Sequence, residues 1–89
     1  MARVVFTSNL MRHVDCPPVD VDGVTVREVL AKIFAENPRL KSYVVDDQFA
    51  LRRHMGIIVD GEIVRDRNGL SDPVESSSEV FVLQALSGG

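Results

Sequence analysis

The chain has 89 residues, enough for one small core with little room for a built-in active-site cleft, and this favours a carrier or binding module over an enzyme. Ten Lys and Arg against thirteen Asp and Glu give a net charge of −3, which leaves no basic excess for following nucleic-acid phosphates. The single cysteine, Cys16, excludes an intramolecular disulfide and falls short of a metal ligand set, so we expect no metal and no bound cofactor.

The N-terminal residues have no signal-peptide character, and no apolar run reaches membrane-spanning length, so we expect a soluble cytoplasmic protein without a membrane partner. β-Branched and aromatic residues predict a first strand over residues 3–7. Alternation over residues 19–21, before an Asp-Gly turn signal, predicts a short second strand paired with the first. Between them, His13 and Cys16 have no neighbouring group that would activate them, and we interpret both as inert.

A helix is predicted from Thr25 to the Asn37-Pro38 pair. Thr25 and Glu28 fit a capping box, in which the threonine oxygen accepts from the first-turn N–H groups and the glutamate reaches back to the cap. The apolar residues recur at helical spacing on one face, which we expect to be core. These residues are Val26, Val29, Leu30, Ile33 and Phe34.

The stretch over residues 39–45 suits either a short helix or a strand, and the sequence does not decide between them. Beyond it, the cluster Arg52-Arg53-His54 suits either an anionic partner or a solvated loop. The loop interpretation is favoured because His54 has no ligand-like companion at a useful spacing.

The clearest local signal is the hairpin of residues 57–64, with its turn at Asp60-Gly61. A polar, turn-rich stretch follows, from which Leu70 and Val74 are expected to reach the core. Residues 79–86 are largely apolar and predict a central strand.

The predicted order is α+β, with one main helix covering one face of a mixed sheet and leaving the other face open. Strand residues alternate between faces, so Val80 and Val82 can face the helix only if Phe81 and Leu83 point outward. An apolar outer face would form an interaction surface if its side chains are contiguous, whereas scattered exposed apolar residues are ordinary on a monomer, and the sequence does not decide between these two interpretations.

The chain stops on Leu86-Ser87-Gly88-Gly89 directly after the last strand. This ending, together with the first strand, the capped helix and the hairpin, resembles the MoaD/ThiS family of ubiquitin-like sulfur carriers. The resemblance covers essentially the whole chain and implies a ubiquitin-like β-grasp domain over residues 1–85 with a flexible diglycine tail over residues 86–89. The serine pair Ser77-Ser78 departs from the Gly-Asp turn that is common in that family before the last strand.

By this resemblance, Gly89 is adenylated by an E1-like adenylyltransferase that uses ATP, and is then converted to a thiocarboxylate. A sulfur donor enzyme would supply the sulfur, and an acceptor synthase would consume it in the biosynthesis of cysteine, molybdopterin or thiamine. This chain would act either as a separate carrier or as the small subunit of that synthase. Family members dock through the sheet, and the matching positions are Val5, Ile63, Phe81 and Leu83. The stretch around residues 51–65 looks most like the branch that includes the cysteine-biosynthesis carrier.

Two other functions are compatible with the sequence. An activated Gly89 could instead be joined to a lysine, as in a ubiquitin-like protein modifier. Alternatively, the chain could be a plain interaction module whose diglycine is incidental. In each case the chain itself is a carrier or ligand and contributes no catalytic group.

Overall fold

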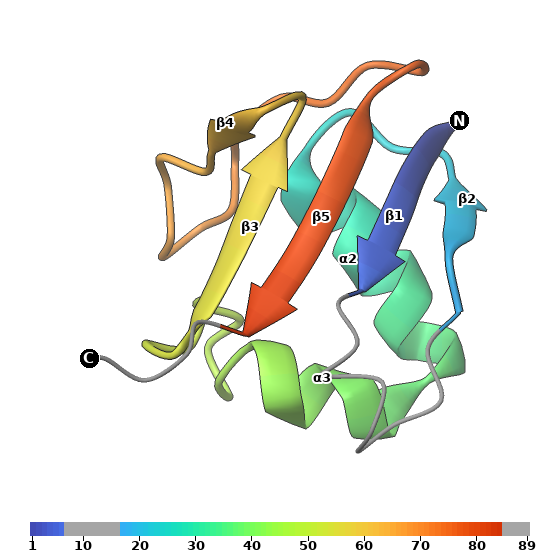
Figure 1. Ribbon diagram of the computed structural model, residues 1–89. Helices are drawn as coiled ribbons and strands as arrows, with labels where there is room; N and C mark the ends of the chain where they lie inside the picture. The colour runs from blue at the N-terminus through green and yellow to red at the C-terminus, as the bar shows by residue number, and fades with distance from the viewer. Residues whose placement is uncertain (7–16, 85–89) are drawn as a thin grey trace.

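The computed structural model describes residues 1–6 and 17–84, and these form a five-stranded mixed sheet in the order β2-β1-β5-β3-β4 (Figure 1). The strands are β1 (Ala2–Phe6), β2 (Val19–Val21), β3 (Met55–Val59), β4 (Glu62–Ile63) and β5 (Glu79–Gln84), and the helices α2 (Val26–Glu36) and α3 (Pro38–Val44) follow β2. β1 runs parallel to β5, and the other three neighbouring pairs are antiparallel. The predicted β-grasp fold, with the last strand at the centre of a mixed sheet, is confirmed.

Helix α2 begins where the capping signal places it. Thr25 has extended backbone angles, and its Oγ1 accepts a hydrogen bond from the N–H of Glu28 at 3.2 Å. All five residues of the predicted apolar face are buried. The helix ends at Asn37, whose N–H donates to the carbonyl of Ile33 at 3.0 Å.

The undecided stretch after Pro38 is helix α3. Proline occupies its first turn, where a missing N–H costs nothing. Leu40 and Val44 lie one turn apart and are both fully buried, so tertiary packing selects the helix over the strand. In Figure 1, α2 lies behind the sheet and α3 runs below the lower ends of β1 and β5, and neither helix covers the opposite face.

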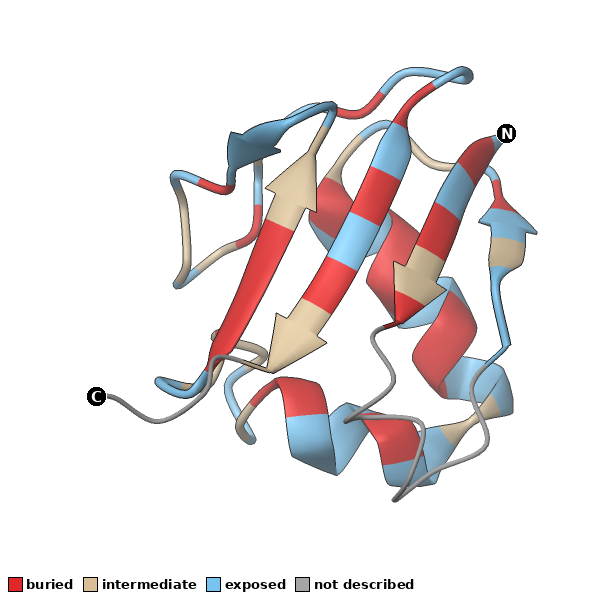
Figure 2. Ribbon diagram, in the orientation of Figure 1, coloured by how far each residue is buried: buried red, intermediate tan, exposed pale blue. Residues whose placement is uncertain are grey.

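The core lies between this helical layer and the inner face of the sheet. Buried and exposed residues alternate along β5, as Figure 2 shows, with Val80 and Val82 at 0% exposure. Leu70 and Val74 also reach the core, as predicted.

Leu30→Ala is expected to cost about 2 to 5 kcal/mol of unfolding free energy, because Leu30 is fully buried and its loss leaves a cavity. That is a large share of the stability of a small domain. Chemical denaturation measures it directly, and a loss below about 1 kcal/mol would show that this helix face is loosely packed.

The predicted hairpin turn is confirmed at Asp60 and Gly61. Their φ angles of 49° and 85° are both left-handed, as a two-residue type I′ turn requires. The turn pairs Val59 with Glu62 and Ile58 with Ile63. Strand β4 ends at Ile63, so Val64, which was expected within the hairpin strand, lies just beyond it and is buried.

The hairpin turn is clamped to the start of β5 by the Asp60 carboxylate. Its Oδ1 accepts from the N–H of Glu79 at 2.9 Å, and its Oδ2 accepts from the hydroxyl of Ser78 at 2.8 Å. The Ser78 oxygen in turn accepts from the N–H of Glu75 at 2.8 Å and is only 2% exposed. The serine that departs from the family pattern therefore fastens the hairpin to the central strand.

These hydrogen bonds predict a pH dependence. The Glu79 N–H and then the Ser78 hydroxyl hold the pKa of Asp60 below its usual value. A carboxyl group with a lowered folded-state pKa stabilises the fold above its unfolded pKa of about 4, and this contribution is lost as the pH falls through the folded value. Asp60→Asn should therefore be less stable than the parent chain at pH 7, and the gap should narrow below about pH 4. Urea unfolding at several pH values tests this, and a gap that stays constant would exclude a role for the ionised carboxylate.

Candidate functional site

The open face of the sheet carries a row of four apolar side chains, one from each of four strands. Phe81 at the centre of β5 is in register with Val5 on β1 and with Ile58 on β3. Ile58 is in turn in register with Ile63 on β4. Residues in direct register point to the same side of a sheet, so these four side chains form a continuous line across it. We call Val5, Phe81, Ile58 and Ile63 the outer-face row.

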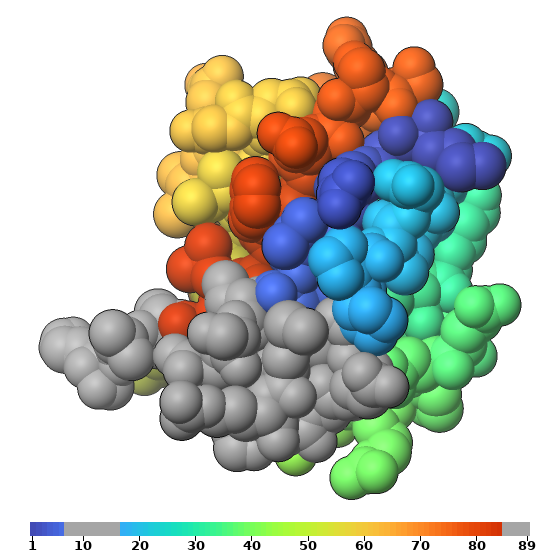
Figure 3. Space-filling model, turned by 45° about the vertical axis from the view of Figure 1, so that its right-hand side comes forward, coloured from blue at the N-terminus to red at the C-terminus, as the bar shows by residue number. Residues whose placement is uncertain are grey.

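The outer-face row is accessible to a partner. Ile63 is 66% exposed and Phe81 is 38% exposed, while Val5 and Ile58 are partly exposed. In Figure 3, side chains of β3, β5, β1 and β2 form one continuous surface, with the helices at its margin. Apolar side chains gathered in this way on an open sheet face form a patch suited to protein docking.

Leu83 comes two residues after Phe81 in β5 and therefore lies on the same face of the sheet. It is in register with Gly56 on β3, and a β-carbon added to Gly56 would lie 3.4 Å from Leu83 Cδ1. The Leu83 side chain therefore lies over Gly56, within van der Waals distance of where a β-carbon would be. All four predicted docking positions, Val5, Ile63, Phe81 and Leu83, therefore lie on one face.

Ile58 is the member of this surface that was missed from the sequence. It stands inside the apolar run Ile57-Ile58-Val59, which shows no alternation of polar and apolar residues. The two-residue turn signal at Asp60-Gly61 could have found it, because that turn fixes the register of Ile58 with the outward-facing Ile63.

Gln84 is the last described residue of β5 and pairs with Met55 at the start of β3. The predicted tail residues Leu86, Ser87, Gly88 and Gly89 lie outside the described residues, as does the predicted domain boundary at residue 85. His13 and Cys16 also lie outside them. The described part thus presents a docking face on the strand that leads directly into the tail.

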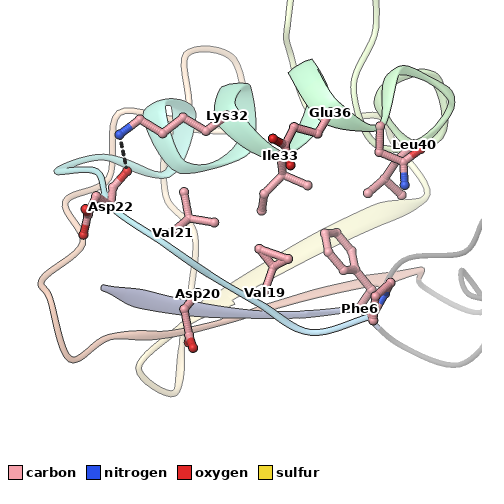
Figure 4. Close-up of a pocket in the computed structure, with 11 residues that line it drawn as sticks. Phe6, Val19, Asp20, Val21, Asp22, Lys32, Ile33, Glu36 and Leu40 are labelled. Carbon is pink, nitrogen blue, oxygen red and sulfur yellow. Dashed lines mark hydrogen bonds between the residues drawn. The ribbon is translucent and has the colours of Figure 1, made fainter.

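A groove of about 490 Å³ lies elsewhere, between β2 and α2 (Figure 4). Phe6, Val19 and Ile33 point into it, and Lys32 Nζ donates to the carbonyl of Asp22 at its rim, at 2.7 Å. The groove lies at the β2 edge, two strands away from the end of β5. Its described lining holds no pairing of a nucleophile with a base, so we assign no chemistry to it.

Two features are absent from the part of the chain that the structure describes. Within residues 1–6 and 17–84, no His, Cys, Asp and Glu side chains gather in a group that could hold a metal ion. Within the same ranges, no helix is long and apolar enough to span a bilayer.

A model of the ThiS family matches residues 13–89. The chain belongs to the ThiS family. The match takes in the last strand, the outer-face residues of β3, β4 and β5, and the diglycine. A comparison with curated proteins finds no significant match.

Solved structures of similar fold span the full length of the chain. A chain of the Amycolatopsis orientalis BexX/CysO complex is 26% identical, with a TM-score of 0.83 and coverage of 100% of both chains. The small archaeal modifier protein 1 from Methanosarcina acetivorans is also 26% identical, with a TM-score of 0.80, and the match covers 99% of this chain and 95% of that one. CysO from Mycobacterium tuberculosis is 24% identical, with a TM-score of 0.80 and coverage of 97% and 100%, and at this identity supports the fold alone. The chain is thus a small ubiquitin-like protein of the carrier and modifier class.

Proposed function

We propose that this chain is a sulfur carrier whose C-terminal Gly89 is converted to a thiocarboxylate that donates sulfur in biosynthesis. The observation that carries the proposal is the ThiS-family match, which runs through the last strand to Gly88-Gly89. Glycines have no side chain beyond Cα and access backbone angles closed to other residues. A diglycine end can therefore thread a narrow channel and present its carboxylate in a partner's active site.

The chemistry of a carboxylate requires an activating partner. A free α-carboxyl has a pKa of roughly 3.5, so at neutral pH it is ionised and resists nucleophilic attack. An E1-like adenylyltransferase would let the Gly89 carboxylate attack the α-phosphorus of ATP, releasing pyrophosphate and leaving an acyl-adenylate. A sulfur donor enzyme then supplies a hydrosulfide equivalent that attacks the carbonyl carbon. AMP leaves with the C–O electron pair, and the thiocarboxylate remains for an acceptor synthase.

The body of the domain would supply binding energy to these partners. The outer-face row offers rigid apolar anchors on a sheet that is already formed, so little conformational entropy is lost on docking. The related BexX/CysO complex supports a binding partner for this chain as well. The proposal covers a carrier for cysteine, molybdopterin or thiamine biosynthesis. It also includes a role for this chain as the small subunit of the acceptor synthase.

A second candidate is protein modification through the same activated Gly89. The similarity to small archaeal modifier protein 1 favours this alternative. Attack by a lysine amine on the acyl-adenylate, or on a thioester derived from it, would give an amide in place of a thiocarboxylate.

Intact mass of the protein isolated from its native host tests the first proposal against the second. A sulfur carrier should show a fraction of molecules in which one oxygen at Gly89 is replaced by sulfur. Alkylation of the thiocarboxylate should move this fraction to a higher mass by adding the alkyl group to its sulfur. A modifier should instead yield branched peptides in which Gly89 is joined to a lysine of another protein. If neither the thiocarboxylate nor the branched peptides were found under sulfur-limited growth, that result would count against both candidate functions.

A further inference from the structure

The cluster Arg52-Arg53-His54, which the proposed function leaves unused, forms a closed turn. The Met55 N–H donates to the carbonyl of Arg52 at 2.9 Å, so Arg53 and His54 are the two central residues of a β-turn. Both central residues are exposed. We call Arg52–Met55 the basic turn.

The basic turn is held in place by two guanidinium groups. Arg52 Nε donates to the carbonyls of Ser42 and Val45, at 2.7 and 3.1 Å, which ties the turn to the end of α3. Arg67 Nη2 donates to the carbonyls of Arg52 and Met55, both at 2.8 Å, which fixes the turn from the other side. These charged donors satisfy backbone carbonyls, so Arg53 and His54 are presented from a fixed backbone.

The basic turn lies next to the C-terminal end of β5, the strand that precedes the tail in the sequence. Met55 pairs with Gln84, the last residue of β5, and Figure 1 shows the start of β3 beside the end of β5. At the next pair of this antiparallel ladder, Gly56 pairs with Leu83, which lies on the outer face. The turn therefore lies beside the outer face at Leu83 and beside the end of β5 at Gln84, which we call the tail root.

Arg53 and His54 take part in none of the ion pairs of the described residues, whereas the guanidinium of Arg52 lies close enough to the Asp46 carboxylate to add to the backbone hydrogen bonds that lower its pKa. The segment over residues 48–59 contains no Asp or Glu, although the whole chain is acidic. The next acidic residue along the chain is Asp60, just past the far end of β3 and roughly 16 Å from Met55 at about 3.3 Å per strand residue. Among the described residues, the ion pairs within 4.0 Å are Met1–Asp22 and Glu62–Arg65, and neither involves the turn.

We infer that the basic turn is a second docking element, which binds a carboxylate-lined surface of the activating enzyme beside the channel that receives the tail. This inference rests on the proposed function and adds the chemistry of the partner surface. Complementary charge at the entrance of a channel speeds encounter and fixes orientation, and a preformed turn does so at low entropic cost. Apolar contacts on the outer face and charge contacts at the tail root would together place Gly89 at ATP.

The test is ATP–pyrophosphate exchange by the activating enzyme of the chain's own host, with this chain as the varied substrate. The variant R53E/H54E reverses the charge at Arg53 and introduces a negative charge at the neighbouring central position. Its matched control, A31E/R39E, makes the same formal charge change at exposed positions on the two helices. The KM for R53E/H54E should rise about 10-fold or more with kcat changed less than about 2-fold, whereas the control should stay within about 2-fold of the parent chain.

Salt and a conservative variant sharpen the result. The KM of the parent chain should rise between about 0.05 and 0.5 M salt, and R53E/H54E should lose this dependence because its steering contact is gone. Arg53→Lys keeps the charge and should keep KM within about 3-fold. Thermal unfolding of each variant within a few degrees of the parent chain separates docking from folding.

Four outcomes would overturn the inference in distinguishable ways. If the parent chain supports exchange and R53E/H54E has an unchanged KM, the docking element is wrong while the carrier function stands. If both glutamate double variants weaken exchange equally, net charge and not the turn is responsible. If ATP alone shifts the amide signals of Arg53 and His54 in the isolated chain, the turn binds nucleotide phosphates instead of a protein surface. A parent chain that supports no exchange would overturn the carrier function and the inference together.

Discussion

Deletion of Gly89 is expected to abolish ATP-dependent activation of the chain. The reacting group in the proposed mechanism is the α-carboxylate of Gly89, and a chain that ends at Gly88 presents its carboxylate one residue, or about 3.5 Å, too early. A misplacement of this size is far larger than the roughly 1 Å that can cost 100-fold in rate. The measurement is pyrophosphate exchange with the activating enzyme, and we expect loss of more than about 100-fold.

The same deletion should leave the fold intact. Among the described residues, the buried core extends no further toward the C-terminus than Val82, and terminal residues ordinarily contribute little to the stability of a domain. Thermal unfolding should therefore give the same midpoint within about 2 °C. Gly89→Ala serves as the matched variant, since it keeps the chain length and the carboxylate but adds a methyl group, and it should lose less activity than the deletion. Undiminished exchange by the deletion variant would falsify Gly89 as the activated residue.

The parts of the fold that were predicted correctly are those encoded by short-range signals. Helix α2 has its cap, its apolar face and its stop within one continuous segment, so each signal reinforces the others. The hairpin is encoded by two residues, Asp60 and Gly61, whose left-handed angles few other pairs adopt readily. The central position of β5 followed from its nearly unbroken apolar run.

Helix α3 remained undecided because its defining contacts are distant. Only two of its seven residues, Leu40 and Val44, are buried, and a single i, i+4 pair does not establish a period. Tyr43 and the two valines that follow it have high strand propensity. The tertiary environment outweighs that propensity because both Leu40 and Val44 enter the core formed by β1, α2 and β5.

The polar contacts that fasten the sheet together could not be found from the sequence. Ser78 and Asp60 are eighteen residues apart, and Arg67 reaches back fifteen residues to the carbonyl of Arg52. Serine and arginine in turn-rich segments read as solvent-exposed, yet Ser78 is buried and Arg67 is partly buried. Such residues are recognisable only after the strand order brings their segments together.

The outer-face row leads to the second prediction, a pair of adjacent substitutions in β5. Phe81→Asp should keep the domain folded and weaken binding to the activating enzyme by about 2 kcal/mol or more, because a central apolar anchor is lost and a charge must be desolvated. Val82→Asp places the same charge one residue away in the core, where Val82 is fully buried. An unpaired charge there costs more than a small domain can tolerate, so this variant should unfold.

Ile63→Asp is a second variant of the outer-face row, which tests docking even if Phe81→Asp proves to be unfolded. Ile63 is 66% exposed on the edge strand β4, so an aspartate there should leave unfolding free energy within about 0.5 kcal/mol of the parent chain. Because Ile63 belongs to the outer-face row, the same variant should still weaken binding, by about 1 kcal/mol or more. Circular dichroism and calorimetric titration with the activating enzyme separate the two effects. Normal binding by a folded Phe81→Asp together with normal binding by Ile63→Asp would mean that partners approach the tail from elsewhere, and the basic turn would then be the first surface to examine.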